Sequence, residues 1–384
     1  MSVLARSSVG TELVGRLAVR GKAAAAVGRE LDSLRALGPR LYRSQARDPI
    51  AHQLATSGRK SVYRSIWEDA VRAVGGEVRE FPPGYLLVQR GDRSLRLWGH
   101  FVPVDDPVTL RLAGDKPAAH ALLAEAGLPV PRHRTVRVPD LDEALDFLHQ
   151  TERIVVKPAS STGAGSGVTG GVRTRADFLS ARLAAARHDA DRLLLEEHAD
   201  GDEYRVLVLD GDPIGVVRRL PPRVVGDGVS TVKALVHAEN LRRQAADGWA
   251  GLWPIRLDLD ARIALRHQDL GLGSVPAAAH VISVKHSTSE GSEKDATVVE
   301  VGDPAVAGVV GDAARAARAI GVRLASVEMV TLDARVPIRD AGGVVIEVNT
   351  TPGLAQHYIV SNVDHAVPVA ATVIDRLLTA QPPD

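Results

Sequence analysis

The stretch VVIEVNTTPG, residues 344–353, carries the pattern that most constrains the fold. Residues i and i+2 of a β-strand point to the same face, so Glu347 and Asn349 project together while Val348 turns toward a core. Mg²⁺ prefers hard oxygen ligands, and a carboxylate with an amide oxygen supplies two of them. The stretch therefore predicts a strand that carries a metal site, and the alternative is the polar face of an edge hairpin.

A second apolar stretch, ASVEMVTL at residues 325–332, contains a single carboxylate, Glu328. A lone carboxylate in a buried strand is costly unless it is paired or bound to a metal. A polar loop, residues 333–343, joins this stretch to the first one, so we expect two antiparallel strands with Glu328 facing Glu347. Two carboxylates at such a short separation repel each other, and a bound cation relieves that repulsion. Glu328, Glu347 and Asn349 are therefore the predicted metal ligands.

A glycine-rich segment, SSTGAGSG at residues 160–167, follows an apolar strand at residues 153–157. Small residues let backbone N–H groups approach anionic oxygens, so the segment suits a phosphate cradle. The Walker A sequence is absent. The dinucleotide fingerprint Gly-x-Gly-x-x-Gly is present as Gly165, Gly167 and Gly170, but an extended segment follows it where that motif needs a helix. Two interpretations stay open: a flap over ATP phosphates with Lys157 beside it, and a disordered linker.

Composition excludes several kinds of chemistry. The 384 residues contain no cysteine, which excludes disulfides, thiolate metal sites and cysteine nucleophiles. A formal net charge of zero and an aromatic content of 3% argue against a nucleic-acid partner. No apolar run reaches the length of a membrane helix, so we expect no membrane partner and a cytoplasmic location. The basic residues among the first 28 suit a targeting peptide or, as we expect, a solvent-facing helical segment.

The order of elements predicts an α+β fold with mixed antiparallel strands. Helices are expected over residues 1–60, 61–75, 116–126, 141–150, 176–187, 231–245 and 303–320. Strands are expected at residues 77–81, 85–90, 94–98, 153–157, 192–197, 204–209, 213–220, 325–332 and 344–349. The turn Asp210-Gly211-Asp212 indicates a hairpin.

Several segments occur in the order typical of one superfamily. They are Lys157-Pro158 with the glycine-rich segment, Glu196-Glu197, GDEYR at 201–205, VVGDG at 224–228, and IEVNTTPG at 346–353. Together they resemble the ATP-grasp superfamily, above all the ATP-grasp parts of cyanophycin synthetases and bifunctional glutathione synthetases. The resemblance covers roughly residues 107–376. It implies an ATP-grasp fold with a pre-grasp lobe at 1–106, a small subdomain with the flap at 107–200, and a C-terminal subdomain with the metal site at 201–384.

The resemblance also implies how ATP and metal are bound. Lys116 and Lys157 would reach the α- and β-phosphates, and Glu203 would hold the ribose hydroxyls. The metal would be Mg²⁺, with Mn²⁺ as a substitute, on the three predicted ligands. The remaining cofactor-binding positions are Glu196 and Glu197 at the adenine hinge and Ser161, Gly163, Gly165 and Gly167 in the flap.

Three cations are the candidate catalytic residues. The resemblance puts Arg205 and Arg219 near the γ-phosphate and the acyl substrate. Where the relatives carry an arginine, this chain has Val284 or, one residue later, Lys285. Arg219 or Lys285 would stabilise the oxyanion of a tetrahedral intermediate.

The resemblance implies an ATP-dependent carboxylate–amine ligase that forms an amide through an acyl phosphate. Its substrates would be a small carboxylate and an amine, at least one of them an amino acid or short peptide. A small-molecule kinase on the same Mg-ATP site and a non-catalytic nucleotide-binding module are the alternatives. We expect a stand-alone ligase without the relatives' partner modules, and we leave its assembly state open, a homodimer included.

Overall fold

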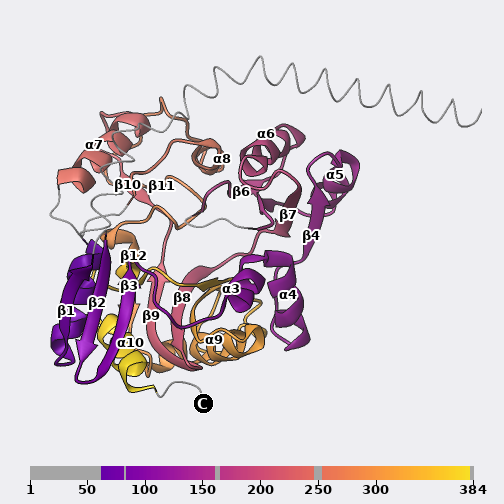
Figure 1. Cartoon of the computed structure of the whole chain (residues 1–384). Helices are drawn as coiled ribbons and strands as arrows, with labels where there is room; N and C mark the ends of the chain where they lie inside the picture. The colour runs from indigo at the N-terminus through magenta and orange to yellow at the C-terminus, as the bar shows by residue number, and fades with distance from the viewer. Residues whose placement is uncertain (1–61, 82–83, 161–164, 246–252, 381–384) are drawn as a thin grey trace, which may run out of the picture. The chain divides into compact units, whose positions relative to one another are not determined.

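The computed structural model describes residues 62–81, 84–160, 165–245 and 253–380 (Figure 1). Residues 54–384 form one compact unit. The helical prediction for residues 1–60 lies outside the described residues, and so do Ser161 and Gly163. The boundaries expected at residues 106 and 200 stay predictions.

The first sheet is an antiparallel meander of β1 (Glu77–Phe81), β2 (Tyr85–Arg90) and β3 (Arg93–Trp98). A helix over residues 62–73 packs against one face of it. The period-2 pattern explains the packing, because alternate residues of β2 and β3 are buried with Trp67 of that helix. The predictions of this helix and these three strands are confirmed.

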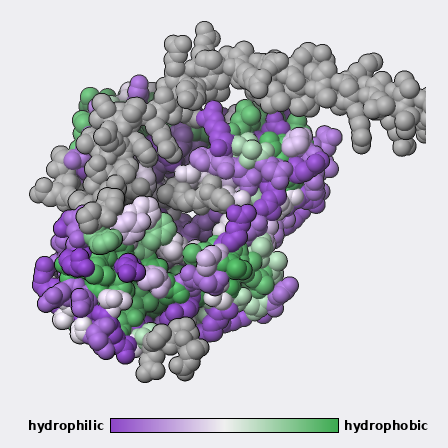
Figure 2. All heavy atoms as spheres, viewed as in Figure 1, coloured by the Kyte–Doolittle hydropathy of each residue, from purple (hydrophilic) through white to green (hydrophobic). Residues whose placement is uncertain are grey.

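The second sheet has the antiparallel order β4-β7-β5-β6. Its strands are β4 (His133–Arg137), β5 (Ile154–Pro158), β6 (Thr169–Val172) and β7 (Arg192–Glu197). Two amphipathic helices, α5 (Leu141–His149) and α6 (Arg175–Ala186), bury Phe147 and Phe178 against it. Hydrophilic residues cover most of their outer surface in Figure 2.

The third sheet carries most of the predicted site, in the order β12-β9-β8-β13-β14. Its strands are β8 (Asp202–Leu209), β9 (Asp212–Arg219), β12 (Ala296–Val299), β13 (Leu324–Thr331) and β14 (Val344–Thr350). All neighbours are antiparallel. The β8–β9 hairpin turns at Asp210 and Gly211, both with positive φ, as the sequence predicted. The α+β fold with antiparallel strands is thus confirmed.

Both faces of β8 are buried. Leu207 and Leu209 pack into the core that holds the first sheet and α10 (Val369–Thr379). Val206 and Val208 point the other way, into a core shared with α9 (Ala307–Ile320). β8 therefore joins two cores.

The remaining elements cover or connect these sheets. They are α3 (Pro107–Gly114), α4 (Lys116–Glu125), α7 (Val232–Ala245), α8 (Leu259–Arg266), the pair β10 (Arg223–Val225) and β11 (Val281–Ser283), and the short 3-10 helices at Glu293–Asp295, Pro304–Val306, Leu354–His357 and Val363–His365. The sequence did not predict α3, although Asp106 caps it and Pro107 opens it. Among the described residues, no helix combines the length and apolar character that crossing a membrane requires.

Trp67 should be the main anchor of the first sheet, because its side chain is fully buried and its Nε1 donates to the Gly99 carbonyl at 2.7 Å. Trp67→Ala should lower the free energy of unfolding by about 3–5 kcal/mol. Trp98→Ala, which removes a half-exposed indole from the same lobe, is the control and should cost much less. Urea denaturation followed by circular dichroism measures both, and equal losses would contradict the assignment.

Candidate active site

The hairpin of β13 and β14 sets the predicted metal ligands side by side. Glu328 and Glu347 are direct cross-strand partners, as the sequence predicted. Asn349 lies opposite Ser326, and its Nδ2 donates to Glu328 Oε1 at 3.1 Å. Val348 is buried in the core. The structure therefore brings Glu328, Glu347 and Asn349 together on one face.

Two lysines from separate elements meet at β14. Lys116, the first residue of α4, places Nζ 2.8 Å from Glu347 Oε1. Lys157 of β5 donates from Nζ to the Ile346 carbonyl at 3.3 Å. Both ammonium groups are buried, so neither is a solvated surface charge. The two predicted phosphate lysines thus converge on neighbouring residues of the strand with the metal ligands.

The two carboxylates of the hairpin are charged to different degrees. Burial raises the pKa of Glu347, but Lys116 and Lys157 outweigh it and hold that pKa at about 2. Burial also raises the pKa of Glu328, and the carboxylates of Glu203 and Glu347 add to it against the opposing charge of Arg205, so that this pKa is about 7. Glu328 is therefore a buried carboxyl whose negative charge is poorly compensated.

The predicted arginines lie on the same sheet face. Arg205 of β8 forms an ion pair with Glu328. Arg219 of β9 places Nη1 3.2 Å from Glu203 Oε1, and its Nη2 donates to the Thr288 carbonyl at 2.8 Å. Thr288 Oγ1 in turn donates to Glu203 at 2.8 Å. Arg205, Arg219 and Glu203 therefore form one network with Glu328.

The two glutamates predicted at the adenine hinge, Glu196 and Glu197, lie in different environments. Glu196 is buried, with Oε1 2.7 Å from Lys157 Nζ, whereas the next residue, Glu197, is exposed at the end of β7. Alternation along the strand explains the difference. The structure brings Glu196, but not the Glu197 side chain, to the lysines.

Two of the predicted flap glycines are described. Gly165 and Gly167 both have positive φ, which glycine adopts without strain. A Cβ at Gly165 would lie 2.4 Å from Ser289 Oγ, and one at Gly167 would lie 2.7 Å from the His188 ring. Both positions therefore lack room for a side chain.

Lys285 lies in a different cluster. It is buried, with Nζ 2.8 Å from Asp258 Oδ2 and 3.2 Å from Glu290 Oε1. Within the described ranges it makes no ion pair with the carboxylates that hold Arg205 and Arg219. The structure thus does not bring Lys285 to the arginines.

Sequence reasoning missed His120 and Thr288. His120 lies one turn after Lys116 on α4 and is buried, with Nε2 3.5 Å from Glu196 Oε1. Burial, with Lys157 nearby, lowers the pKa of His120 to about 3, so its ring is neutral. The i, i+4 spacing from Lys116 could have revealed it, whereas Thr288 sits in a segment without periodicity.

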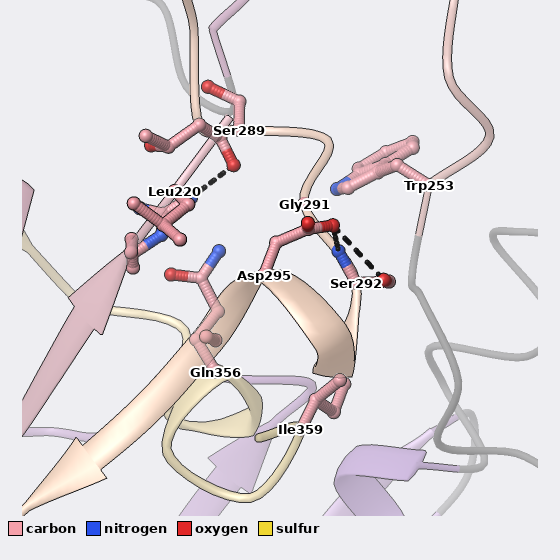
Figure 3. Close-up of a pocket in the computed structure, with 11 residues that line it drawn as sticks. Leu220, Trp253, Ser289, Gly291, Ser292, Asp295, Gln356 and Ile359 are labelled. Carbon is pink, nitrogen blue, oxygen red and sulfur yellow. Dashed lines mark hydrogen bonds between the residues drawn. The ribbon is translucent and has the colours of Figure 1, made fainter. Parts of the chain in front are cut away.

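A pocket opens beside Arg219 (Figure 3). Trp253, Leu220 and Ile359 supply apolar surface, and the Asp295 carboxylate accepts from Ser292 N and Oγ at 3.0 and 3.1 Å. Gln356 Oε1 is buried there and accepts no hydrogen bond from the described residues. The remaining lining residues are Thr288, Ser289, Gly291 and Ala296.

The described residues contain no metal centre built only from acidic or histidine side chains. Nowhere in the described part of the chain do three His, Cys, Asp or Glu side chains form a group that could hold a metal ion. A metal site at the hairpin would therefore depend on two carboxylates, one amide oxygen and further ligands such as phosphate or water.

Several known proteins are similar in sequence to this chain over most of its length. A cyanophycin synthetase from Synechocystis is 30% identical over 279 residues, which are 71% of this chain and 31% of that protein. One from Nostoc is 32% identical over 272 residues, covering 70% and 29%. A bifunctional glutathione biosynthesis protein from Desulfotalea psychrophila is 26% identical over 293 residues, covering 75% and 37%. The chain thus spans about a third of the length of these relatives.

No family model matches the chain. The crystal structure of a bifunctional glutathione synthetase from Pasteurella multocida is 24% identical, with a TM-score of 0.49, and covers 80% of this chain and 44% of that one. The sequence relatives, together with the ordered segments from Lys157 to Gly353, show that the chain belongs to the ATP-grasp superfamily and is similar to the cyanophycin synthetases and the bifunctional glutathione synthetases.

Proposed function

We propose that the chain is an ATP-dependent carboxylate–amine ligase that forms an amide bond through an acyl phosphate. The observation that carries the proposal is the meeting of Lys116 and Lys157 at Ile346 and Glu347, beside Glu328. Two buried cations next to two carboxylates suit the phosphates of a nucleotide and its divalent ion. The relatives named as synthetases support the same class of reaction.

Glu328, Glu347 and Asn349 would hold Mg²⁺, or Mn²⁺ in its place. The fit rests on their hard oxygen atoms, which share one face of the hairpin, and on the poorly compensated charge of Glu328. When bound, the ion would neutralise charge on the phosphates of ATP.

In the first step, an oxygen of the substrate carboxylate would attack the γ-phosphorus of ATP. The bond from that phosphorus to the β,γ-bridging oxygen would break, ADP would leave, and an acyl phosphate would form. Lys116 and Lys157 would offset phosphate charge, and Glu196 and His120 would line the nucleotide side of Lys157. Glu203 stays our candidate for the ribose hydroxyls.

In the second step, the amine nitrogen would attack the acyl carbon. The carbon–oxygen bond to phosphate would break, and inorganic phosphate and the amine proton would leave. Arg219 is the cation that we assign to the oxyanion, because it lies between Glu203, Thr288 and the pocket. Arg205 would support Glu328, and Lys285 is a less direct candidate because Asp258 and Glu290 already surround it.

The pocket beside Arg219 would take the amine substrate, an amino acid or short peptide. Trp253, Leu220 and Ile359 would cover an apolar part of that molecule. The unused Gln356 Oε1 would accept one of its N–H groups.

Glu347→Gln should abolish turnover, because it removes the charge that the two lysines and the ion require while keeping the side-chain shape. ADP release should fall by about 10²–10³-fold. Circular dichroism should show an intact fold. Glu125→Gln, which changes an exposed glutamate at the end of α4, is the control and should keep normal turnover. Normal ADP release from Glu347→Gln would overturn the assignment.

Hydroxylamine should trap the acyl phosphate. With ATP, Mg²⁺ and an accepted carboxylate, the enzyme should form a hydroxamate in place of the amide, because hydroxylamine attacks the same acyl carbon. Mass spectrometry of a panel of amino-acid pairs measures both products. A stable phosphoester without any hydroxamate would instead identify a kinase, and nucleotide binding without turnover across the panel would identify a binding module.

Gln356→Leu should weaken binding of the amine substrate and leave binding of ATP unchanged. Losing one hydrogen bond should raise the KM for the amine by about tenfold, with the KM for ATP unchanged. Steady-state kinetics with an amine from the same panel measures both KM values. Gln89→Leu, at an exposed position on β2, is the control. An increase confined to the KM for ATP would place the amine elsewhere.

A further inference from the structure

Residues 286–289, which we term the bridging loop, touch two parts of the molecule. Thr288 contacts the candidate active site, since its carbonyl accepts from Arg219 and its hydroxyl donates to Glu203. Ser289 contacts the glycine-rich side, because its Oγ leaves no room for a Cβ at Gly165. One short loop thus lies between the two features expected to handle the phosphates.

Asp260 on α8 holds this loop and β6 at once. Its Oδ2 accepts from the backbone N–H groups of His286 and Ser287, each at 3.2 Å. Its Oδ1 accepts from Gly170 N at 2.9 Å. Gly170 belongs to β6, the strand that follows the glycine-rich segment. One buried carboxylate therefore satisfies three backbone donors from two separate segments.

Asp260 remains ionised while it does so. Burial raises its pKa, but the neighbouring His286 side chain and the charge of Lys285 outweigh this and hold the pKa at about 2. Both oxygens are therefore acceptors throughout the physiological range. This also gives a use for Lys285 that needs no contact with substrate.

The packing of β6 against the bridging loop is close. A Cβ at Gly170 would lie 2.7 Å from His286 Cβ, and a Cβ at Gly171 would lie 2.5 Å from His286 Nε2. Gly171 also has a positive φ of 65°. Two adjacent glycines thus let the strand lie directly on the imidazole, so displacing either segment must disturb the other.

We propose that Asp260 is a positioning residue that couples β6 to Thr288 and Arg219. The position of β6 and the placement of Arg219 would then depend on each other. Asp260 itself need not touch substrate. The kinetic part of this inference rests on the proposed function, whereas the coupling of the two segments does not.

Asp260→Asn in the full chain tests the coupling. Asparagine keeps the shape but replaces one acceptor oxygen by an N–H donor, which faces another N–H group. In hydrogen exchange read by mass spectrometry, amides of residues 168–172 and of 286–289 should both exchange about tenfold faster than in the wild type. Asp258→Asn is the matched control, because it changes the cap of the same helix, where asparagine also caps well. Among the described residues, Asp258 bonds Lys285 and makes no hydrogen bond to β6.

Three results would overturn the coupling: a change in only one segment, the same change in Asp258→Asn, or no change. If Asp260→Asn does not fold, Gly170→Ala tests the contact from the other side and should speed exchange at residues 286–289. Unaltered exchange there would also reject the coupling.

Kinetics then test the positioning role. Asp260→Asn should lower kcat for ADP release about tenfold or more. Combined with Thr288→Val it should lose less than the product of the two single effects, because both act through one loop. Independent, multiplicative losses would overturn the role. A wild-type chain that releases no ADP with any substrate would instead reject the ligase proposal and leave the exchange result standing.

Discussion

The pairing of Glu328 with Glu347 on two buried strands is the constraint on which the rest of the site depends. Two carboxylates side by side in a poorly solvated place repel each other and need cations. Four elements supply these cations: Lys116 on α4, Lys157 on β5, Arg205 on β8 and Arg219 on β9. Lys157 thereby links the second sheet to the third.

The balance of charge within that group is uneven. Lys116 and Lys157 hold the pKa of Glu347 low, whereas burial raises the pKa of Glu328 despite the nearby charge of Arg205. Uneven charge compensation is typical of functional sites. Stability alone would favour complete neutralisation of both carboxylates. The uneven compensation also supports our proposal that the hairpin holds an added cation.

Local patterns in the sequence predicted the parts of the site that are local in the chain. The alternation in residues 325–332 and 344–349, joined by one short loop, was enough to predict both strands and the facing of Glu328 and Glu347. The contact of Lys157 with Glu196 depends on the order of strands in the second sheet, which no local pattern contains. Thr288 lies in an irregular loop, and Asp260 bonds backbone N–H groups of the same loop. Such a loop shows neither a hydrophobic period nor a sequence motif. The roles of Glu203 and Lys285 came from resemblance alone.

β8, whose two faces lie in different cores, has a consequence for how the protein is made. The core that contains Trp67 is completed by Ile374, roughly 300 residues later in the chain. A nascent chain on the ribosome must therefore expose the apolar face of its first sheet until α10 emerges. We expect this core to be completed only after α10 has been synthesised, a need for protection from aggregation until then, and low tolerance for loss of α10.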